Sequence, residues 1–269
     1  MTNLSVIISS NKSYYKLKNI INFTSKNNKV SEIIIIGPNV KNDLLFINNT
    51  SIHKKNSFES PSKCLNFAIN SITNRYFCSI PDDITFDVIN PFDQLFELKI
   101  QHKNKIFSTR YFINGENNTH ELYLDNKYNL KDYYKNLVIP LCPIIDKDDF
   151  LKVKGIDQNI IHSYWDVDLI LKILEVKKYE ICFSYIALNE YKDSRPTLYS
   201  IYGQIDKYYF YKKWKSKISN KKYNFPKIDL KKVFHKWKFK NLFFYNIMSL
   251  KIFEYLIFQY NKRLFRKFN

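Results

Sequence analysis

Residues 76–84 read YFCSIPDDI, an aromatic and apolar run that ends in a proline and two adjacent aspartates. Apolar side chains on both faces of the run indicate a strand that is covered on both sides. Asp82 and Asp83 follow this strand directly. Pro-Asp-Asp is good turn chemistry, and two carboxylates at a strand end can also bind a hard divalent cation. The stretch by itself leaves both interpretations open.

The residues before this strand predict an α/β nucleotide-binding topology. In chain order, the pattern predicts a strand at 4–9 (LSVIIS), a helix at 16–23, a strand at 32–36, a helix at 61–73 and a strand at 76–80. Parallel strands joined by helices bring their carboxyl ends to one edge of the sheet, where open α/β sheets bind ligands. We therefore expect Asp82 and Asp83 at a ligand-binding edge.

The second half of the chain carries another pair of acids. It predicts helices at 91–101 and 165–176, a short helix capped by Asp146 that ends at Gly155, and strands at 105–113, 137–145 and 179–186. Asp166 and Asp168 stand in the first turn of the helix at 165–176, within WDVDL. Acids in a first turn are favoured by capping and the helix dipole, and one of them could also be a general base.

Charge is distributed unevenly along the 269 residues. The formal net charge is +18, with carboxylates concentrated between Asp82 and Asp193 and a basic, aromatic segment after residue 200. A helical projection of Lys231–Phe268 places Ile252, Leu256 and Ile257 on an apolar face, with Lys and Arg opposite. Such a helix can lie on an anionic membrane or pack on the domain, and amphipathicity alone does not separate the two.

The cysteines and the first residues of the chain indicate the cellular compartment. The four cysteines have no CxxC spacing and stand in apolar settings, which predicts buried thiols in a reducing compartment. The first residues, MTNLSVIISSNKSYY, lack the pattern of a signal peptide, and no uncharged apolar run is long enough to span a membrane. We expect a cytoplasmic protein, either free or peripheral on the inner face of a membrane.

The order of these segments resembles family 2 glycosyltransferases of the GT-A fold. LSVIISSNKSYYKLKNIINF and SEIIIIGPN are similar to the opening of that family, and KCLNFAINSITNRYFCSIPDDI to its asparagine and acidic DXD-like motif. Gly155-Ile156-Asp157, WDVDL and YYFYKKW (208–214) are similar to the acceptor half and the segment that follows it. The resemblance covers roughly residues 4–214.

The resemblance implies a Rossmann-like α/β/α sandwich with a mostly parallel central sheet and a basic amphipathic helical C-terminal tail. Residues 1–200 would form the catalytic domain, with a nucleotide-sugar half at about 1–90 and an acceptor half at about 91–200, and 201–269 the extension. The implied activity is inverting, metal-assisted hexosyl or related glycosyl transfer from a nucleoside-diphosphate sugar to a glycan or lipid-linked hydroxyl. Surface polysaccharide or glycoconjugate synthesis would be the setting.

The resemblance also assigns residues. Asp83 would bind Mn²⁺ or Mg²⁺, and Asp82 would contact the donor ribose or the metal's surroundings. Asp166 would be the catalytic general base. Further contacts to the nucleotide sugar would come from Ser9, Asn11, Asn39 and Asn66.

The chain departs from the family pattern at three places. Pro81 replaces the first acid of the triple-aspartate form, Gly37-Pro38-Asn39 replaces aspartates that read the base, and Trp165 replaces the glutamate before the general base. An inactive relative therefore remains an alternative. A non-enzymatic binder of nucleic acid or of an anionic membrane is the other. It gives no account of the acids at two element ends, so nucleic acid is the less favoured partner.

Overall fold

The protein is seen in a computed structural model that describes residues 3–10, 14–37, 50–54, 61–82, 84–113, 116–117, 127–135, 137, 139–160, 163–190 and 199–218. Its first half is a βα arrangement whose strands β1 to β4 belong to one sheet. The elements are β1 (Leu4–Ser9), α1 (Tyr14–Thr24), β2 (Val30–Gly37), β3 (Thr50–Lys54), α2 (Pro61–Ala68), β4 (Tyr76–Pro81), β5 (Ile84–Phe86) and α3 (Pro91–Gln101).

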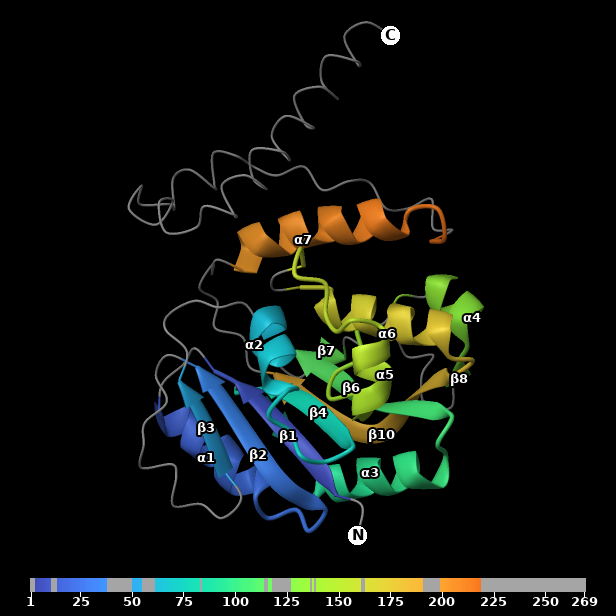
Figure 1. The fold of residues 1–269 in the computed structure, drawn as a ribbon. Coiled ribbons are helices and arrows are strands. Elements are labelled where there is room, and N and C mark those ends of the chain that lie inside the picture. Colours follow the sequence, from blue (N-terminus) through green and yellow to red (C-terminus); the bar gives the residue numbers. More distant parts are fainter. Residues whose placement is uncertain are drawn as a thin grey trace, which may run out of the picture.

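The second half continues with shorter elements. They are β6 (Lys105–Ile113), β7 (Glu116–Asn117), β8 (Lys127–Tyr128), α4 (Leu130–Lys135), β9 (Ile145–Asp146), α5 (Lys147–Lys152), α6 (Trp165–Val176), β10 (Glu180–Glu190) and α7 (Tyr199–Trp214). In this view α7 lies above α6 and on the same side of the sheet as α2 (Figure 1).

The central sheet has the strand order β3-β2-β1-β4-β9. The first four strands are mutually parallel, and only β9 is antiparallel. β1 and β4 are in register, so that Ser9 at the end of β1 stands opposite Pro81 at the end of β4. This sheet confirms the predicted α/β class and the predicted mostly parallel centre, and it brings the ends of β1 and β4 together.

Helices cover both faces of this sheet because its strands are apolar on both faces. Ile7, Ile34 and Phe77 share one core cluster with residues of α2, α5, α6 and α7. Val6, Ile8 and Cys78 share the other with residues of α1 and α3. Neighbouring residues of a strand point to opposite faces, which is why Ile7 and Ile8 belong to different clusters. The result is the expected three-layer sandwich.

A second sheet, which the sequence did not predict, has the order β5-β10-β6-β7, with β8 also paired to β10. β6 and β10 are parallel, and the other pairs are antiparallel. The strand predicted at 137–145 is wrong. Pro140 and Pro143 lack the amide donors of a strand ladder, and the described residues of this segment form an isolated bridge between Leu141 and Thr109 before β9 begins at Ile145.

Other boundaries differ in smaller ways. α2 ends at Ala68, earlier than predicted, although Ile69 and Ile72 remain buried behind it. β3 lies in a segment without a strand prediction. All four cysteines are buried thiols, as expected. Within the described chain, every helix is too short or too polar to cross a bilayer. The helix predicted at 231–268 lies outside the described residues.

Candidate active site

The carboxyl ends of β1 and β4 bring two predicted residues and one new one together. Ser9 ends β1, and Asp82 directly follows β4. The hydroxyl of Ser10 donates a hydrogen bond to the Asp82 carboxylate, which is 6% exposed. This hydrogen bond links the ends of two neighbouring strands. Parallel α/β sheets bind ligands at this edge. Ser10 was missed because nothing in the sequence distinguishes it from Ser9.

Three predicted donor-side residues lie outside the described residues: Asn11, Asn39 and Asp83. Each follows a strand of the central sheet closely in sequence, since β1 ends at Ser9, β2 at Gly37 and β4 at Pro81. Their roles stay predictions.

The chemistry of the strand edge fits a hard divalent cation. Mg²⁺ and Mn²⁺ prefer carboxylate oxygens and are often bound through one or two of them, with water and phosphate oxygens completing the shell. Asp82 supplies one carboxylate at this edge, and Asp83 is its neighbour in the sequence. Among the described residues, no group of three or more His, Cys, Asp and Glu side chains could bind a metal ion.

The side-chain amide of Asn66, in α2, makes two hydrogen bonds to the backbone of one residue in the acceptor half. Its Nδ2 donates to the Ile156 carbonyl and its Oδ1 accepts from the Ile156 amide, both at 2.8 Å. Gly155 precedes this contact with a φ of 62°, and a Cβ there would lie 2.4 Å from Asn66 Oδ1. In this structure Asn66 therefore fastens the turn at 155–157 to α2, and its predicted contact with the nucleotide sugar stays a prediction.

Asp166 lies in the first turn of α6 and is buried, at 8% exposure. Its Oδ1 accepts a hydrogen bond from the Val167 amide at 2.8 Å. Burial raises the pKa of Asp166 to about 6, against the opposing effect of backbone N–H groups. Above that pH the carboxylate is ionised and can accept a proton, which is the property required of a general base near neutral pH.

Asp168 has a different environment, although it is only two residues away. It is fully buried, its Oδ1 accepts from Trp214 Nε1 at 2.8 Å, and Lys213 Nζ lies 2.7 Å from the same oxygen. Lys213 also pairs with Asp157 at 3.0 Å. Burial raises the pKa of Asp168, and the bonds from Lys213 and Trp214 offset part of that rise. Asp168 therefore anchors α7 to α6, a distinction that WDVDL alone did not contain.

The network around α6 includes residues that sequence reasoning did not single out as functional. They are Asp157, Lys213 and Trp214, together with Asp206, whose Oδ2 accepts from the Ser163 amide at 2.8 Å. Asp157 and Trp214 belong to the GID and KKW segments, which carried only a resemblance. Asp206 gave no local signal, because a buried acid in a helix looks like a surface acid in sequence.

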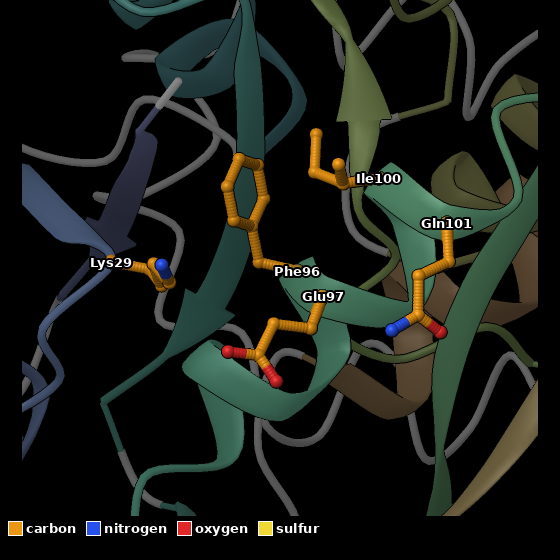
Figure 2. A pocket seen from close by; sticks show the side chains of 5 residues that line it. All are labelled: Lys29, Phe96, Glu97, Ile100 and Gln101. Carbon is orange, nitrogen blue, oxygen red and sulfur yellow. The ribbon is translucent and has the colours of Figure 1, made fainter. Parts of the chain in front are cut away.

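One described pocket, drawn in Figure 2, is lined by none of these residues. It is an open hollow beside α3, lined by Lys29, Phe96, Glu97, Ile100 and Gln101. The Lys29 carbonyl accepts from the amide of Leu4, the first residue of β1, so the hollow lies at the amino ends of the strands. The candidate site lies at the opposite edge of the same sheet.

The sequence matches no protein-family model and no curated protein. Its fold, however, matches solved glycosyltransferase structures. TarS of Staphylococcus aureus aligns with a TM-score of 0.57 at 12% identity, and GalNAc-T7 bound to UDP, GalNAc and Mn²⁺ with 0.55 at 12%. The mannosyltransferase PcManGT of Pyrobaculum calidifontis, bound to GDP-Man and Mn²⁺, aligns with 0.60 at 8%.

These alignments cover most of the chain and a smaller share of the relatives. The alignment with TarS covers 69% of this chain and 60% of TarS. The alignment with GalNAc-T7 covers 92% of this chain and 57% of that protein, and the one with PcManGT covers 80% and 64%. At such identities the likeness concerns the fold. The chain therefore has the GT-A-like α/β fold of glycosyltransferases.

Proposed function

We propose that this protein is a glycosyltransferase that uses a nucleoside-diphosphate sugar and inverts the anomeric carbon, as in family 2. The observation that carries the proposal is the buried Asp166 carboxyl at the start of α6, in a fold shared with glycosyltransferases. The donor class is supported by structures of similar fold: TarS has been solved with UDP-GlcNAc and PcManGT with GDP-Man.

The donor would bind at the edge formed by β1 and β4. Ser9 and Asp82 stand at adjacent strand ends there, and Ser10 fixes the Asp82 carboxylate. Asn11, Asn39 and Asn66 would add contacts to the nucleotide sugar. Asp83 would bind Mn²⁺ or Mg²⁺, and Asp82 would contact the donor ribose or the metal's surroundings; two similar structures contain Mn²⁺. The bound cation would supply positive charge that stabilises the departing diphosphate.

The chemical step needs one proton acceptor from the protein. The Asp166 carboxylate would remove the proton of the acceptor hydroxyl while that oxygen forms a bond to the anomeric carbon of the sugar. The bond between this carbon and the diphosphate oxygen breaks on the opposite face, and its electron pair leaves with the nucleoside diphosphate. Attack opposite the leaving group inverts the anomeric carbon.

The acceptor and location are proposed with less support from the described residues. We propose a hydroxyl of a glycan or a lipid-linked acceptor, in surface polysaccharide or glycoconjugate synthesis. The basic segment after residue 200 would provide a peripheral contact with the anionic inner face of a membrane, since Lys and Arg are attracted to such surfaces. The protein would then be cytoplasmic, with a catalytic domain at 1–200 and an extension at 201–269.

Nucleotide binding tests the proposal most directly. Calorimetry and thermal shift with UDP, GDP, TDP and CMP, and with the corresponding nucleotide sugars, would be run with and without Mn²⁺. We expect one nucleotide to raise the melting temperature in a metal-dependent manner, because a ligand that binds only the folded state stabilises it. Asp83→Ala should remove the metal dependence. Absence of binding to every nucleotide would overturn the proposal.

A further inference from the structure

α7 contacts the chain on both sides of Asp166. Before it, the fully buried Asp206 carboxylate accepts from the Ser163 amide at 2.8 Å. After it, Lys213 and Trp214 bind Asp168. Asp166 itself accepts from Val167 within its own turn. A separate helix thus contacts the residues on both sides of the proposed base.

Tyr164, which lies between Ser163 and α6, has a backbone conformation that residues other than glycine rarely adopt. Tyr164 has φ 65° and ψ 0°, in the left-handed region, which costs roughly 1 kcal/mol for a residue other than glycine. Its ring lies 5.1 Å from the ring of Phe210 and 6.2 Å from that of Tyr211, both on α7. Packing on α7 therefore stabilises the turn that leads into Asp166.

We propose that α7 is a positioning helix for the general base, and that Asp206 is the positioning residue that fixes the 163–164 turn ahead of Asp166. The proposal rests on the function proposed above. A general base acts only within hydrogen-bond reach of the hydroxyl it deprotonates, and a displacement of about 1 Å can cost 10²-fold in rate. Asp206 would thus govern the rate of transfer without touching substrate.

Loss of the Asp206–Ser163 contact should leave the proposed donor site unchanged. That site is formed by Ser10 and Asp82 at the ends of β1 and β4. Loss of the Asp206 contact should therefore lower kcat and leave nucleotide affinity unchanged. A merely structural role would instead lower both, in proportion to the fraction of protein that unfolds.

The test uses the full-length protein with the nucleotide sugar that binds, an acceptor panel, and calorimetry with the free nucleotide. Asp206→Ala should lower kcat about 10- to 100-fold, while the Kd for the nucleotide stays within about twofold. Asp206→Asn should retain most of the rate, because its amide oxygen can still accept from Ser163. Tyr164→Ala removes the ring contacts and should lower kcat in the same direction.

The matched control is Lys217→Met. Lys217, three residues after the end of α7, pairs with Glu175 near the C-terminal end of α6, and this variant should keep the wild-type kcat. A folded Asp206→Ala with wild-type kcat would overturn the positioning role, as would an equal loss in Lys217→Met. If Asp206→Ala does not fold, Tyr164→Ala decides the question by the same criteria. A wild-type protein that neither binds nucleotides nor transfers sugar would overturn the proposed function instead, and the positioning role with it.

Discussion

At the scale of single residues, Asp166 and Asp168 show how environment separates two identical side chains in one helical turn. Asp168 is bound by Lys213 and Trp214 from α7, so its carboxylate is already used for packing. Asp166 accepts only a local backbone bond among its described hydrogen bonds, and burial raises its pKa to about 6. Of the two, Asp166 has the environment that suits proton transfer.

Asp166→Asn should lower the transfer rate by about 10²- to 10⁴-fold, the usual contribution of a general base. In the wild type, kcat/KM should fall about tenfold per pH unit below about 6, because protonation removes the base. Steady-state kinetics between pH 4.5 and 8 measures both. Wild-type activity in Asp166→Asn would refute the assigned role.

The same substitution should stabilise the protein at neutral pH. The pKa of Asp166 is raised on folding, so between about 4 and 6 the folded state binds more protons than the unfolded state. Stability from this group is therefore present at low pH and is lost as the pH rises through about 6. An asparagine cannot ionise, and we expect a gain of about 1–3 kcal/mol at pH 7 in urea unfolding. A gain that persists at pH 4 would contradict this explanation.

Gly155→Ala should destabilise the turn that Asn66 fastens, by about 1–3 kcal/mol. The residue has φ 62°, and a Cβ would lie 2.4 Å from Asn66 Oδ1 and 2.9 Å from Phe150 Cε1. Urea unfolding of both single variants and of the Asn66→Ala/Gly155→Ala double variant measures the coupling. The cost of Gly155→Ala should be smaller when Asn66 is already alanine, and strictly additive costs would contradict a steric conflict with Asn66.

At the scale of elements, α7 is part of the packed core as well as the start of the predicted extension. Phe210, Tyr211 and Trp214 belong to the same core cluster as α2, α5 and α6. Two lysines, one in α7 and one just after it, pair with acids of α6 and differ in the burial of the contact. Lys213 reaches a fully buried carboxylate, whereas both partners of the Lys217–Glu175 pair are partly exposed.

Lys213→Met and Lys217→Met should therefore differ in cost. Removal of Lys213 leaves Asp168 buried with less compensation, and we expect a loss of about 1–3 kcal/mol. Loss of the partly exposed Lys217–Glu175 pair should lower the free energy of unfolding by about 1 kcal/mol or less. Chemical denaturation of both variants at pH 7 tests the difference, and equal losses would show that burial of Asp168 does not decide the strength of the contact.

At the scale of the whole molecule, the fold and the charge come from different parts of the chain. The described residues build a GT-A-like sandwich with two sheets, whereas much of the +18 charge lies after residue 200. This uneven charge is the basis of the proposed contact with an anionic surface.

Deletion of residues after about 225 should abolish binding to liposomes that contain anionic lipid and leave nucleotide binding intact. Co-sedimentation at low and high salt measures the first, since attraction to an anionic surface is screened by salt. Neutral liposomes serve as the control. Unchanged sedimentation of the shortened protein would instead favour a helix that packs on the domain.

The sequence by itself determined the parallel sheet and the helices around it. Continuous apolar runs such as 33–36 are local signals, and they predicted β1, β2 and β4 to within two residues. Helical spacing predicted α3 and α6 in the same way. Placement of Asp82 at the ligand edge followed from that order. β3, β5, β7 and β8 carried no such signal, because short strands depend on the partner that they pair with. The strands β6 and β10 were predicted, but their pairing into a second sheet was not.

Only the tertiary structure decided what the polar residues do. It assigned Asn66 to the Ile156 backbone, Asp168 to Lys213 and Trp214, and Asp206 to the turn before Asp166. These contacts join residues 43 to 90 positions apart in the chain. The burial and partners of a carboxylate or amide depend on which elements pack together, and no local pattern contains that information.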